Sequence, residues 1–381
     1  MFYSSRFSPV KKLNIFSSLT FALIVLVIIF ADSIITNLSL HLDNHLQLHT
    51  QLKLTSERII NTLNPRDLDL LSTSGLATDF DSRVRSFFSL NQCKIQVFMT
   101  WISPVDLFGE REFFGLESLF QTNPKSCLII LSKTMDSETG RQILDPLINL
   151  GFWVQAISPD IWGLLKSTPA ENWLIDIKNG KKDPGIYPFA QNLSNLIRLA
   201  ALYKYGGVYL DTDFIVLKDI SGLRNSIGAQ SVDASGHWTR LNNALLVFEK
   251  EHFLVYKFIE EFALSFDGSR WGHNGPLLVS RVVNSLTKTG ERNFTILPPA
   301  AFYPFSWTRV GGFFVRPKDR VGAKWVDLKT RQLNGLSYAV HLWNKQSRGL
   351  KIEDGSIIDR LVYAHCVICS RNISSSSSSS S

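Results

Sequence analysis

The sequence predicts an α/β fold, because short apolar runs that fit buried strands alternate with segments of helical periodicity from about residue 93 onward. The composition agrees with this class. Hydrophobic residues make up 45% of the 381 residues and charged residues 19%, which suffices for a sizeable core. The apolar run 208–210 also leads directly into two aspartates, as at the carboxyl end of a parallel strand. We therefore expect a largely parallel sheet with a ligand site at that edge.

The expected elements fall into two halves. In the first half, strands are expected at 95–101, 127–131, 152–157 and 208–210, and helices at 113–120, 141–149 and 193–205. In the second half, strands are expected at 244–248, 294–297 and 338–342, and helices at 252–266 and 275–288. Asn192 or Ser194 is the expected cap of the helix at 193–205, and Gly206 and Gly207 end it just before the strand that carries the aspartates.

The N-terminal part contains an uncharged apolar segment, 15–31, at the short end of the length that a bilayer requires. Arg6, Lys11 and Lys12 precede this segment, so the positive-inside tendency places the tail 1–14 in the cytosol and the rest of the chain in the lumen. We interpret 15–31 as a transmembrane signal anchor, with a cleaved signal peptide as the alternative. Both interpretations send the main domain into the secretory pathway.

Two further segments have distinct compositions. Residues 32–92 are polar without a sustained strand pattern, and we interpret them as a stem with some helix around 40–60. Residues 373–381 are serine-rich and expected to be disordered. The formal net charge of +7 is partly supplied by the N-terminal tail, and no basic run with interleaved aromatics occurs. A nucleic-acid partner is therefore not expected.

The cysteines and sequons fit a lumenal domain. Four cysteines allow three disulfide pairings, and Cys366 and Cys369 lack the second ligand pair of a zinc site. A disulfide or free thiols are therefore favoured over zinc. Asn192 is not expected to carry a glycan, because it lies at a predicted helix start. The cysteines are Cys93, Cys127, Cys366 and Cys369, and the sequons are at Asn37, Asn192, Asn293 and Asn372.

The strongest local signal is Asp211-Thr212-Asp213. Side chains two residues apart in an extended segment point the same way, so both carboxylates can face one ligand. Mg²⁺ and Mn²⁺ prefer carboxylate oxygens and are often completed by substrate phosphates. Phosphatases of the haloacid-dehalogenase type also carry Asp-x-Asp, but near the domain start and with Thr or Val where Ile215 stands here. The pattern therefore favours a nucleotide-sugar transferase over a metal-dependent phosphatase.

Several ordered motifs resemble the α-1,4-glycosyltransferase family with a sugar-binding Asp-x-Asp region, of the globotriaosylceramide-synthase type and with plant members. The resemblance covers about residues 93–370. One motif extends from Asn192 to Arg198 and continues from Tyr203 to Asp213. The later motifs are Asn242-Asn243-Ala244, Trp271-Gly-His-Asn-Gly-Pro276 and His341-Leu-Trp-Asn344.

The resemblance implies a GT-A fold, with a Rossmann-like nucleotide-sugar-binding half at 93–225 joined to an acceptor-binding half at 226–372. It implies a type II Golgi membrane enzyme with a lumenal catalytic domain and a UDP-sugar or similar donor. It further implies dependence on Mn²⁺ or Mg²⁺. Galactose, glucose or N-acetylglucosamine would pass to a glycolipid or glycan with retention, giving an α-linkage. Because no covalent nucleophile is identifiable, we favour a same-face displacement. A homodimer and a non-catalytic lumenal sugar-binding protein stay open as alternatives.

The resemblance also assigns the metal and donor residues. Asp211 and Asp213 are expected to be catalytic and to bind the metal, with His341 as a third ligand, although a lone histidine on a strand is often structural. Arg198, Asn195, Tyr209 and Asp211 are expected to contact the donor. The family often has Asp where Asn195 stands. Asn keeps an amide for hydroxyl groups but loses the charge. Independently, a guanidinium in the apolar helix suits a phosphate or a fixed carboxylate.

The acceptor side is assigned in the same way. Asn243, Trp271, His273 and Asn274 are expected to bind the acceptor or the transferred sugar. Side chains of these types can also have a purely structural role instead of binding a sugar. Trp271 can fill the core instead of stacking on a sugar, and His273 and Asn274 can belong to a turn before the helix that Pro276 opens.

Overall fold

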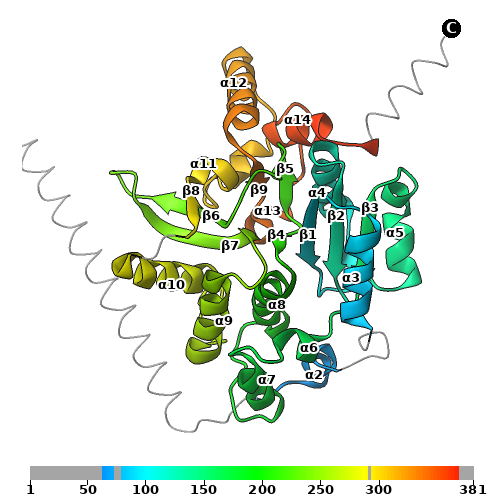
Figure 1. Cartoon of the computed structure of the whole chain (residues 1–381). Helices are drawn as coiled ribbons and strands as arrows, with labels where there is room; N and C mark the ends of the chain where they lie inside the picture. The colour runs from blue at the N-terminus through cyan, green and yellow to red at the C-terminus, as the bar shows by residue number, and fades with distance from the viewer. Residues whose placement is uncertain (1–61, 73–78, 291–292, 369–381) are drawn as a thin grey trace, which may run out of the picture. The chain divides into compact units, whose positions relative to one another are not determined.

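The computed structural model describes residues 62–72, 79–290 and 293–368 (Figure 1). The predicted anchor at 15–31, the predicted helix around 40–60 and the serine-rich tail lie outside these residues. Across the described ranges, no helix combines the length and the hydrophobicity needed to cross a membrane. All described residues belong to the compact unit Asn61–Ser381.

A mixed sheet runs through this unit. Its strands are β1 (Ile95–Thr100), β2 (Ser126–Leu131), β3 (Trp153–Ile157), β4 (Gly207–Leu210), β6 (Ser226–Val232), β7 (Trp238–Phe248) and β8 (Thr295–Leu297). They lie in the order β3-β2-β1-β4-β7-β6-β8. The first four are parallel, whereas β7 is antiparallel to both β4 and β6. The α/β class is confirmed, but the expected parallel arrangement holds only for the first four strands.

Helices pack on both faces of the sheet because successive side chains of a strand point to opposite sides. Phe98 of β1 joins one buried cluster and its neighbours Val97 and Met99 join another. The first cluster includes α3 (Phe80–Leu90), α6 (Ile161–Leu165), α7 (Glu171–Lys178), α8 (Phe189–Tyr205), α9 (Phe253–Ser265) and α10 (Pro276–Thr289). The second includes α4 (Glu110–Thr122), α5 (Glu138–Ile148) and α11 (Pro299–Phe302).

A third, smaller cluster lies around a two-stranded sheet made of β5 (Phe214–Val216) and β9 (Ala339–His341). The helices α12 (Arg320–Leu336) and α14 (Ile357–Ala364) pack against each other and contribute to this cluster. The two strands are antiparallel, with Phe214 opposite His341. This pairing brings a residue from the end of the chain beside the segment that follows β4.

The fold begins earlier in the chain than the sequence predicts. Phe80, Val84 and Phe88 of α3 are buried in the same cluster as Phe98, and Leu71 beside α2 (Pro65–Leu70) is buried there too. The core therefore starts before residue 93, where the predicted stem was expected to end. Cys93 and Cys127 form a disulfide that ties the start of β1 to β2, which is one of the three possible pairings.

The helix before the aspartates also begins earlier than predicted. Because α8 starts at Phe189 with Pro188 as its cap, neither Asn192 nor Ser194 is the cap, and that prediction is wrong. Asn192 is instead buried inside the helix, consistent with the expectation that this sequon carries no glycan. The predicted end is confirmed, since Gly206 closes α8 with a φ of 71°.

Candidate active site

The two aspartates flank the short turn between β4 and β5. Asp211 follows the last residue of β4, and its backbone N–H donates to the carbonyl of Ala244 on β7 at 2.8 Å. Asp213 precedes β5, and its carbonyl accepts from the N–H of Leu342 at 2.8 Å. The backbone of each aspartate is therefore bonded to a different sheet, and the pair lies at the carboxyl end of a parallel strand as predicted.

Asp211 is held by two buried side chains. The hydroxyl of Tyr209 donates to its carboxylate at 2.6 Å, and a guanidinium nitrogen of Arg198 lies 3.2 Å from the same carboxylate. Burial raises the pKa of Asp211, and the charge of Arg198 opposes that shift. The structure thus shows the fixed carboxylate that the sequence predicts as one possible partner of Arg198, and because Arg198 also lines the cavity described below, its contact with the donor stays a prediction.

Arg198 itself is 6% exposed and well satisfied. Its Nη1 donates to the carbonyl of Asn243 at 2.9 Å, its Nη2 donates to the hydroxyl of Ser194 at 3.2 Å, and the guanidinium lies over the ring of Tyr209 at 4.5 Å. Burial favours the neutral form, but the negative charge of Asp211 raises the pKa of Arg198 above its ordinary value. A guanidinium held this way stays charged and orients Asp211.

Asp213 faces the C-terminal part of the chain. Its Oδ1 lies 3.3 Å from Nε2 of His341, and its Oδ2 accepts the backbone N–H of Asn344 at 2.9 Å. The other ring nitrogen of His341, Nδ1, accepts the backbone N–H of Trp343 at 3.1 Å. One potential ligand atom each from Asp211, Asp213 and His341 lies within 4.8 Å of the other two. The structure therefore gathers the three residues that the sequence predicted as metal ligands.

Trp343 adopts an unusual backbone conformation at this point. Its φ of 55° and ψ of 57° are left-handed, a conformation that bulky side chains rarely take. The ring packs 4.4 Å from the ring of His341, and its Nε1 donates to the carbonyl of Phe305 at 3.0 Å. The turn into α13 (Asn344–Ser347) thereby directs the N–H of Asn344 to Asp213 and fixes His341 from one side.

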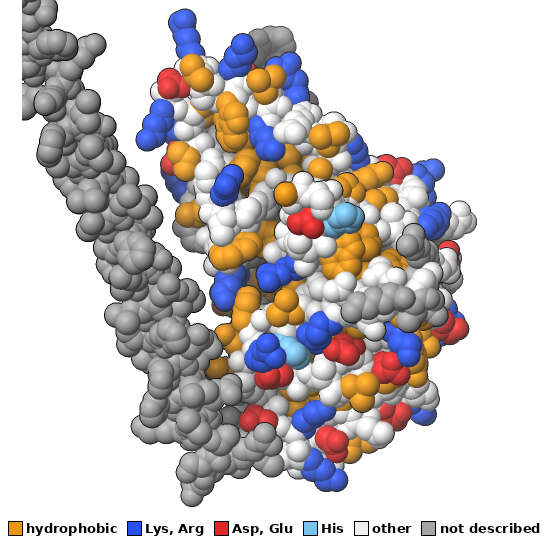
Figure 2. Space-filling model, turned by 90° about the vertical axis from the view of Figure 1, so that its left-hand side faces the viewer, with side chains coloured by type: hydrophobic (Ala, Val, Ile, Leu, Met, Phe, Trp, Pro, Cys, Tyr) orange, Lys and Arg blue, Asp and Glu red, His pale blue; other side chains and the backbone are white. Residues whose placement is uncertain are grey.

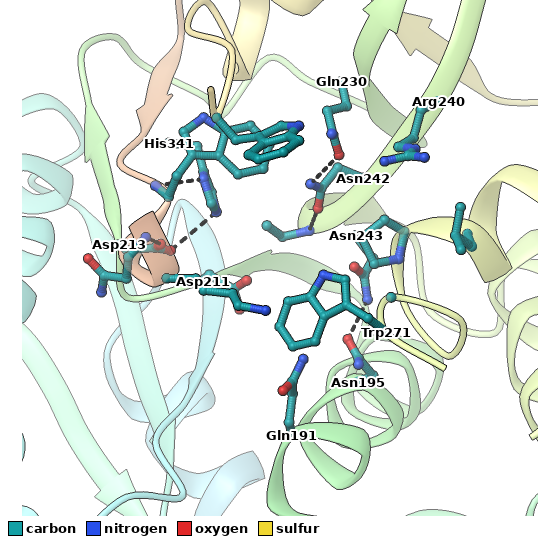
Figure 3. Close-up of a pocket in the computed structure, with 18 of the residues that line it drawn as sticks. Gln191, Asn195, Asp211, Asp213, Gln230, Arg240, Asn242, Asn243, Trp271 and His341 are labelled. Carbon is teal, nitrogen blue, oxygen red and sulfur yellow. Dashed lines mark hydrogen bonds and ion pairs between the residues drawn. The ribbon is translucent and has the colours of Figure 1, made fainter. Parts of the chain in front are cut away.

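These groups line a cavity of about 650 Å³. In Figure 3, Asp211, Asp213 and His341 lie on one side of it, Gln230 and Arg240 lie across from them, and Trp271 projects between. The cavity takes residues from several elements: α8, the turn after β4, both strands of the β6–β7 hairpin, the start of α10, and the turn into α13. Its size is that of a site for a small organic ligand.

Most of the other predicted donor and acceptor residues also reach this cavity. Asn195 and Asn243 line it and are bonded together, since Nδ2 of Asn243 donates to Oδ1 of Asn195 at 2.8 Å. Trp271 lines it with 46% of its surface exposed, and the ammonium of Lys345 lies 3.3 Å from its ring centre. The alternative in which Trp271 fills the core does not fit this exposure.

Three predicted residues lie outside the lining. Tyr209 is fully buried beneath Asp211, where it acts through its hydrogen bond to the carboxylate. His273 is buried and bonds through Nε2 to the carbonyl oxygen of Ser265 at 2.7 Å. Asn274 is 2% exposed and bridges Asn192 of α8 and the backbone of Asp267. For His273 and Asn274, the turn that was the structural alternative describes what the structure shows.

Several lining residues were missed from the sequence. Lys345 directly follows the His341-Leu-Trp-Asn344 motif, so its position beside that motif could have identified it as a candidate site residue. Arg240 and Gln230 sit on a hairpin whose outer part has no clear strand pattern, and Trp307 sits in an irregular segment, so neither position carried a local signal. The additional lining residues include Gln191, Gln230, Arg240, Asn242, Trp307 and Lys345.

Comparison with known proteins gives matches in both halves of the chain. The glycosyltransferase sugar-binding region containing the DXD motif matches residues 109–233, and the alpha 1,4-glycosyltransferase conserved region matches residues 247–373. Together they contain most of the residues that line the cavity, whereas four lining residues lie between the two regions: Arg240, Asn242, Asn243 and Ala244. The two aspartates fall in the first region and His341 in the second.

Named relatives agree with these regions. Lactosylceramide 4-alpha-galactosyltransferase of Pongo pygmaeus is 36% identical over 52% of this chain and 87% of its own length. The Mus musculus protein of that name is 34% identical over 63% of this chain and 64% of its own length. Alpha-1,4-N-acetylglucosaminyltransferase of Homo sapiens is 27% identical over 54% of this chain and 58% of its own length.

Coverage and structural similarity are more limited. The chain spans less than two thirds of the mouse relative and 45% of a longer Arabidopsis thaliana relative. The solved glycosyltransferase GlyE of Streptococcus pneumoniae has a TM-score of 0.42 and 14% identity, over 74% of this chain and 64% of that one, which is too distant to support an argument. The sequence matches carry the assignment: this chain belongs to the α-1,4-glycosyltransferase family whose sugar-binding region contains an Asp-x-Asp motif.

Proposed function

We propose that this chain transfers a hexose from a nucleotide-sugar donor to a hydroxyl group of a glycolipid or glycan, with retention and therefore an α-linkage. The observation that carries the proposal is the cluster of Asp211, Asp213 and His341 on the wall of the cavity. A relative named for galactose transfer and another named for N-acetylglucosamine transfer support a hexose or an N-acetylhexosamine. Galactose, glucose and N-acetylglucosamine are the donor sugars to test.

The donor set fits a divalent cation. Two carboxylates and one imidazole, with ligand atoms inside 4.8 Å of one another, suit Mn²⁺ or Mg²⁺ with substrate phosphate oxygens completing the coordination. When bound, such an ion supplies positive charge that stabilises the diphosphate as the leaving group. The charge of Arg198 opposes the rise in the pKa of Asp211 that burial causes and orients its carboxylate, and the N–H of Asn344 holds Asp213.

Other residues that line the cavity offer groups that can bind a sugar. Asn195 and Asn243 offer amides to sugar or ribose hydroxyls, and the half-exposed ring of Trp271 offers a face for sugar stacking. Asp211 and Asp213 are the two carboxylates among the described residues that line the cavity, and both belong to the cation cluster. This supports a same-face displacement, in which the acceptor oxygen bonds to the anomeric carbon while the bond to the diphosphate breaks and the departing phosphate takes the acceptor proton.

The cellular setting is part of the same proposal. We place the chain in the Golgi as a single-pass type II protein anchored by residues 15–31, with the catalytic unit in the lumen. The disulfide between Cys93 and Cys127 supports an oxidising compartment. Relatives whose name includes lactosylceramide support a glycolipid acceptor in a membrane.

Turnover of the full-length chain tests the reaction. UDP-galactose, UDP-glucose and UDP-N-acetylglucosamine are offered with Mn²⁺, and release of UDP is measured with and without a chelator. Asp211→Asn and Asp213→Asn are expected to lower kcat at least about 100-fold, because each removes charge from the site where the leaving group is stabilised. Asp233→Asn, at an exposed turn, serves as the matched control and is expected to keep full activity. Equal turnover by all four proteins would refute the assignment.

A further inference from the structure

Helix α12 exposes an apolar stripe on the side away from the core. The inner side of α12 is buried against the core: Val326 and Leu333 are 3% and 1% exposed and pack with α14. On its outer side, Val321 is 79% exposed, Trp325 49% and Leu328 54%. Their spacing of four and three residues puts these three side chains on one face of the helix. In the described part of the chain, the ring of Trp325 lies 5.9 Å from the ring of Phe313, and all three side chains keep about half or more of their surface exposed.

A basic stripe runs beside the apolar one. Arg320, Lys324 and Arg331 are all exposed, and their spacing of four and seven residues places them together along one flank of the outer face. Among the described residues, none of the three forms an ion pair. The nearby acids are engaged elsewhere: Asp319 caps the start of α12, and Asp327 pairs with Arg360.

The segment before α12 also combines excess positive charge with exposed apolar side chains. Residues 307–336 contain seven Lys and Arg residues against two Asp residues. Trp307 and Val315 in this segment are 46% and 45% exposed. Figure 2 shows Lys and Arg side chains interspersed with hydrophobic ones at the upper end of the molecule, which is the end where α12 lies in Figure 1. We call Val321, Trp325, Leu328 and the three flanking cations the outer face of α12.

We propose that the outer face of α12 docks on an anionic lipid surface. An apolar stripe containing Trp, bordered by Lys and Arg, matches a helix that lies in the plane of a membrane interface. The basic flank is complementary to anionic headgroups of the leaflet that faces the lumen, which is the leaflet available to this unit in the topology proposed above. The apolar stripe can bury its side chains at the acyl boundary of that leaflet, which removes them from water. This docking does not depend on the reaction proposed above, because none of its residues line the cavity.

The test places a polarity-sensitive fluorophore on the outer face. Val321→Cys is labelled with a nitrobenzoxadiazole group in the full-length chain, whose described part has no free cysteine. Leu264→Cys on α9 is the matched control, because Leu264 is 78% exposed and Val321 is 79% exposed. Both proteins are reconstituted in vesicles of phosphatidylcholine with or without phosphatidylserine, and emission wavelength and quenching by an aqueous quencher are recorded.

The label at position 321 is expected to shift to shorter wavelength and to become protected from the quencher when phosphatidylserine is present, whereas the label at 264 does neither. Replacing Arg320, Lys324 and Arg331 with Gln is expected to lower the docked-to-undocked ratio roughly fivefold per residue, or about 1 kcal/mol each. Circular dichroism confirms that the helix remains folded in these variants.

Two outcomes would overturn the proposal. One is an emission from position 321 that equals that from position 264 in every vesicle. The other is a label at 321 that responds to an added protein and not to lipid, which would make the outer face a protein-binding surface. Because the first comparison uses only the labelled chain with all its cations intact, it decides the question even if the glutamine variants are unstable.

Discussion

At the scale of single residues, the cation cluster is the part of the site that the sequence specifies most directly. Asp211 and Asp213 are two residues apart and follow a buried strand, so their local spacing was enough to predict that both face one ligand. The structure brings them together across a turn between β4 and β5, not along an extended segment. His341 is far away in the chain, and only the family motif indicated it. The structure shows the physical reason for its position, which is the pairing of β9 with β5 directly after Asp213.

Roles that depend on which way a side chain faces were harder to predict. His273 and Asn274 lie in the same motif as Trp271, but their side chains bond to Ser265, Asp267 and Asn192 and not to the cavity. The motif is visible in the sequence, but the turn that directs Trp271 into the cavity and the side chains of His273 and Asn274 away from it is not. Tyr209 likewise acts on Asp211 from beneath, so its predicted contact with the donor stays a prediction.

Arg198→Lys tests whether the guanidinium positions Asp211. An ammonium is a single point charge and cannot reach Asp211, the carbonyl of Asn243 and Ser194 together. We expect Mn²⁺ affinity to fall roughly 10- to 100-fold, as for losses of groups that orient metal ligands. Titration with Mn²⁺ followed by electron paramagnetic resonance measures this. Arg316→Lys, at an exposed guanidinium, is the control, and equal affinity in both variants would show that Arg198 has no positioning role.

At the scale of elements, the turn between α8 and β4 was predictable because two glycines mark it. Gly207 has a φ of 103°, and a Cβ added there would lie 2.4 Å from the carbonyl oxygen of Gln96 on β1. The two glycines thus let a helix turn at once into the strand that carries Asp211. This close approach explains why the strand begins directly after the helix.

Gly207→Ala is therefore expected to destabilise the protein by about 2–3 kcal/mol, from the left-handed backbone strain and the contact with Gln96. Chemical denaturation measures the free energy of unfolding. Gly222→Ala is the matched control, because its Cβ meets no atom within 4 Å and its φ is not positive. If Gly207→Ala were as stable as Gly222→Ala, the steric account of this turn would be wrong.

The elements that the sequence missed have weak patterns for identifiable reasons. β6 contains two serines, a glycine and a glutamine, and its pairing with β7 shifts register. The outer half of β7 is polar because it lies at the exposed end of the hairpin. α12 carries apolar residues on its exposed side, which hides the inward-facing periodicity of Val326 and Leu333.

α3 is joined to the segments that follow β2 and β3 by a charged contact that predicts a pH dependence. Arg83 bonds both oxygens of Asp136 at 2.7 and 2.8 Å, and the N–H of Ser158 donates to the same carboxylate at 2.7 Å. Burial opposes the charged form, but these hydrogen bonds prevail and lower the pKa of Asp136. A lowered folded pKa contributes stability above the unfolded value of 3.8, and this contribution is lost as the pH falls towards the folded pKa.

Asp136→Asn is expected to cost about 2 kcal/mol of unfolding free energy at neutral pH, because it removes charge-assisted hydrogen bonds from a partly buried site. The difference from wild type should shrink as the pH falls below 3.8, and denaturation at several pH values measures it. Glu138→Gln, which loses an exposed pair with Arg141, should change stability little at any pH. A difference for Asp136→Asn that does not vary with pH would contradict the ionic account.

At the scale of the whole molecule, the class and order of the first-half elements were predictable because each strand is a short apolar run with a helix after it. The antiparallel half was not, since strand direction depends on connections that the local pattern does not encode. The beginning of the core was also misplaced, because α3 is short and its three buried residues lie in an otherwise polar stretch.

The disulfide between Cys93 and Cys127 constrains this core. It closes a loop of 34 residues between the first two strands, and a loop of that length corresponds to about 3–4 kcal/mol of stabilisation. The variant with both cysteines replaced by Ser is expected to lose about that amount in chemical denaturation. Loss of less than about 1 kcal/mol would show that the sheet does not depend on this link.

Binding of UDP to the full-length chain, measured by calorimetry with and without Mn²⁺, tests whether Asp211, Asp213 and His341 hold a cation that binds the donor. We expect wild type to bind UDP far more tightly with Mn²⁺ than with a chelator. Asp213→Asn and His341→Ala should lose most of that difference, because each removes one ligand of the cluster. Asp219→Asn, which removes an exposed carboxylate, should keep it. UDP binding that is unaffected by Mn²⁺ in wild type, or an Mn²⁺ effect that persists in Asp213→Asn and His341→Ala, would contradict the claim.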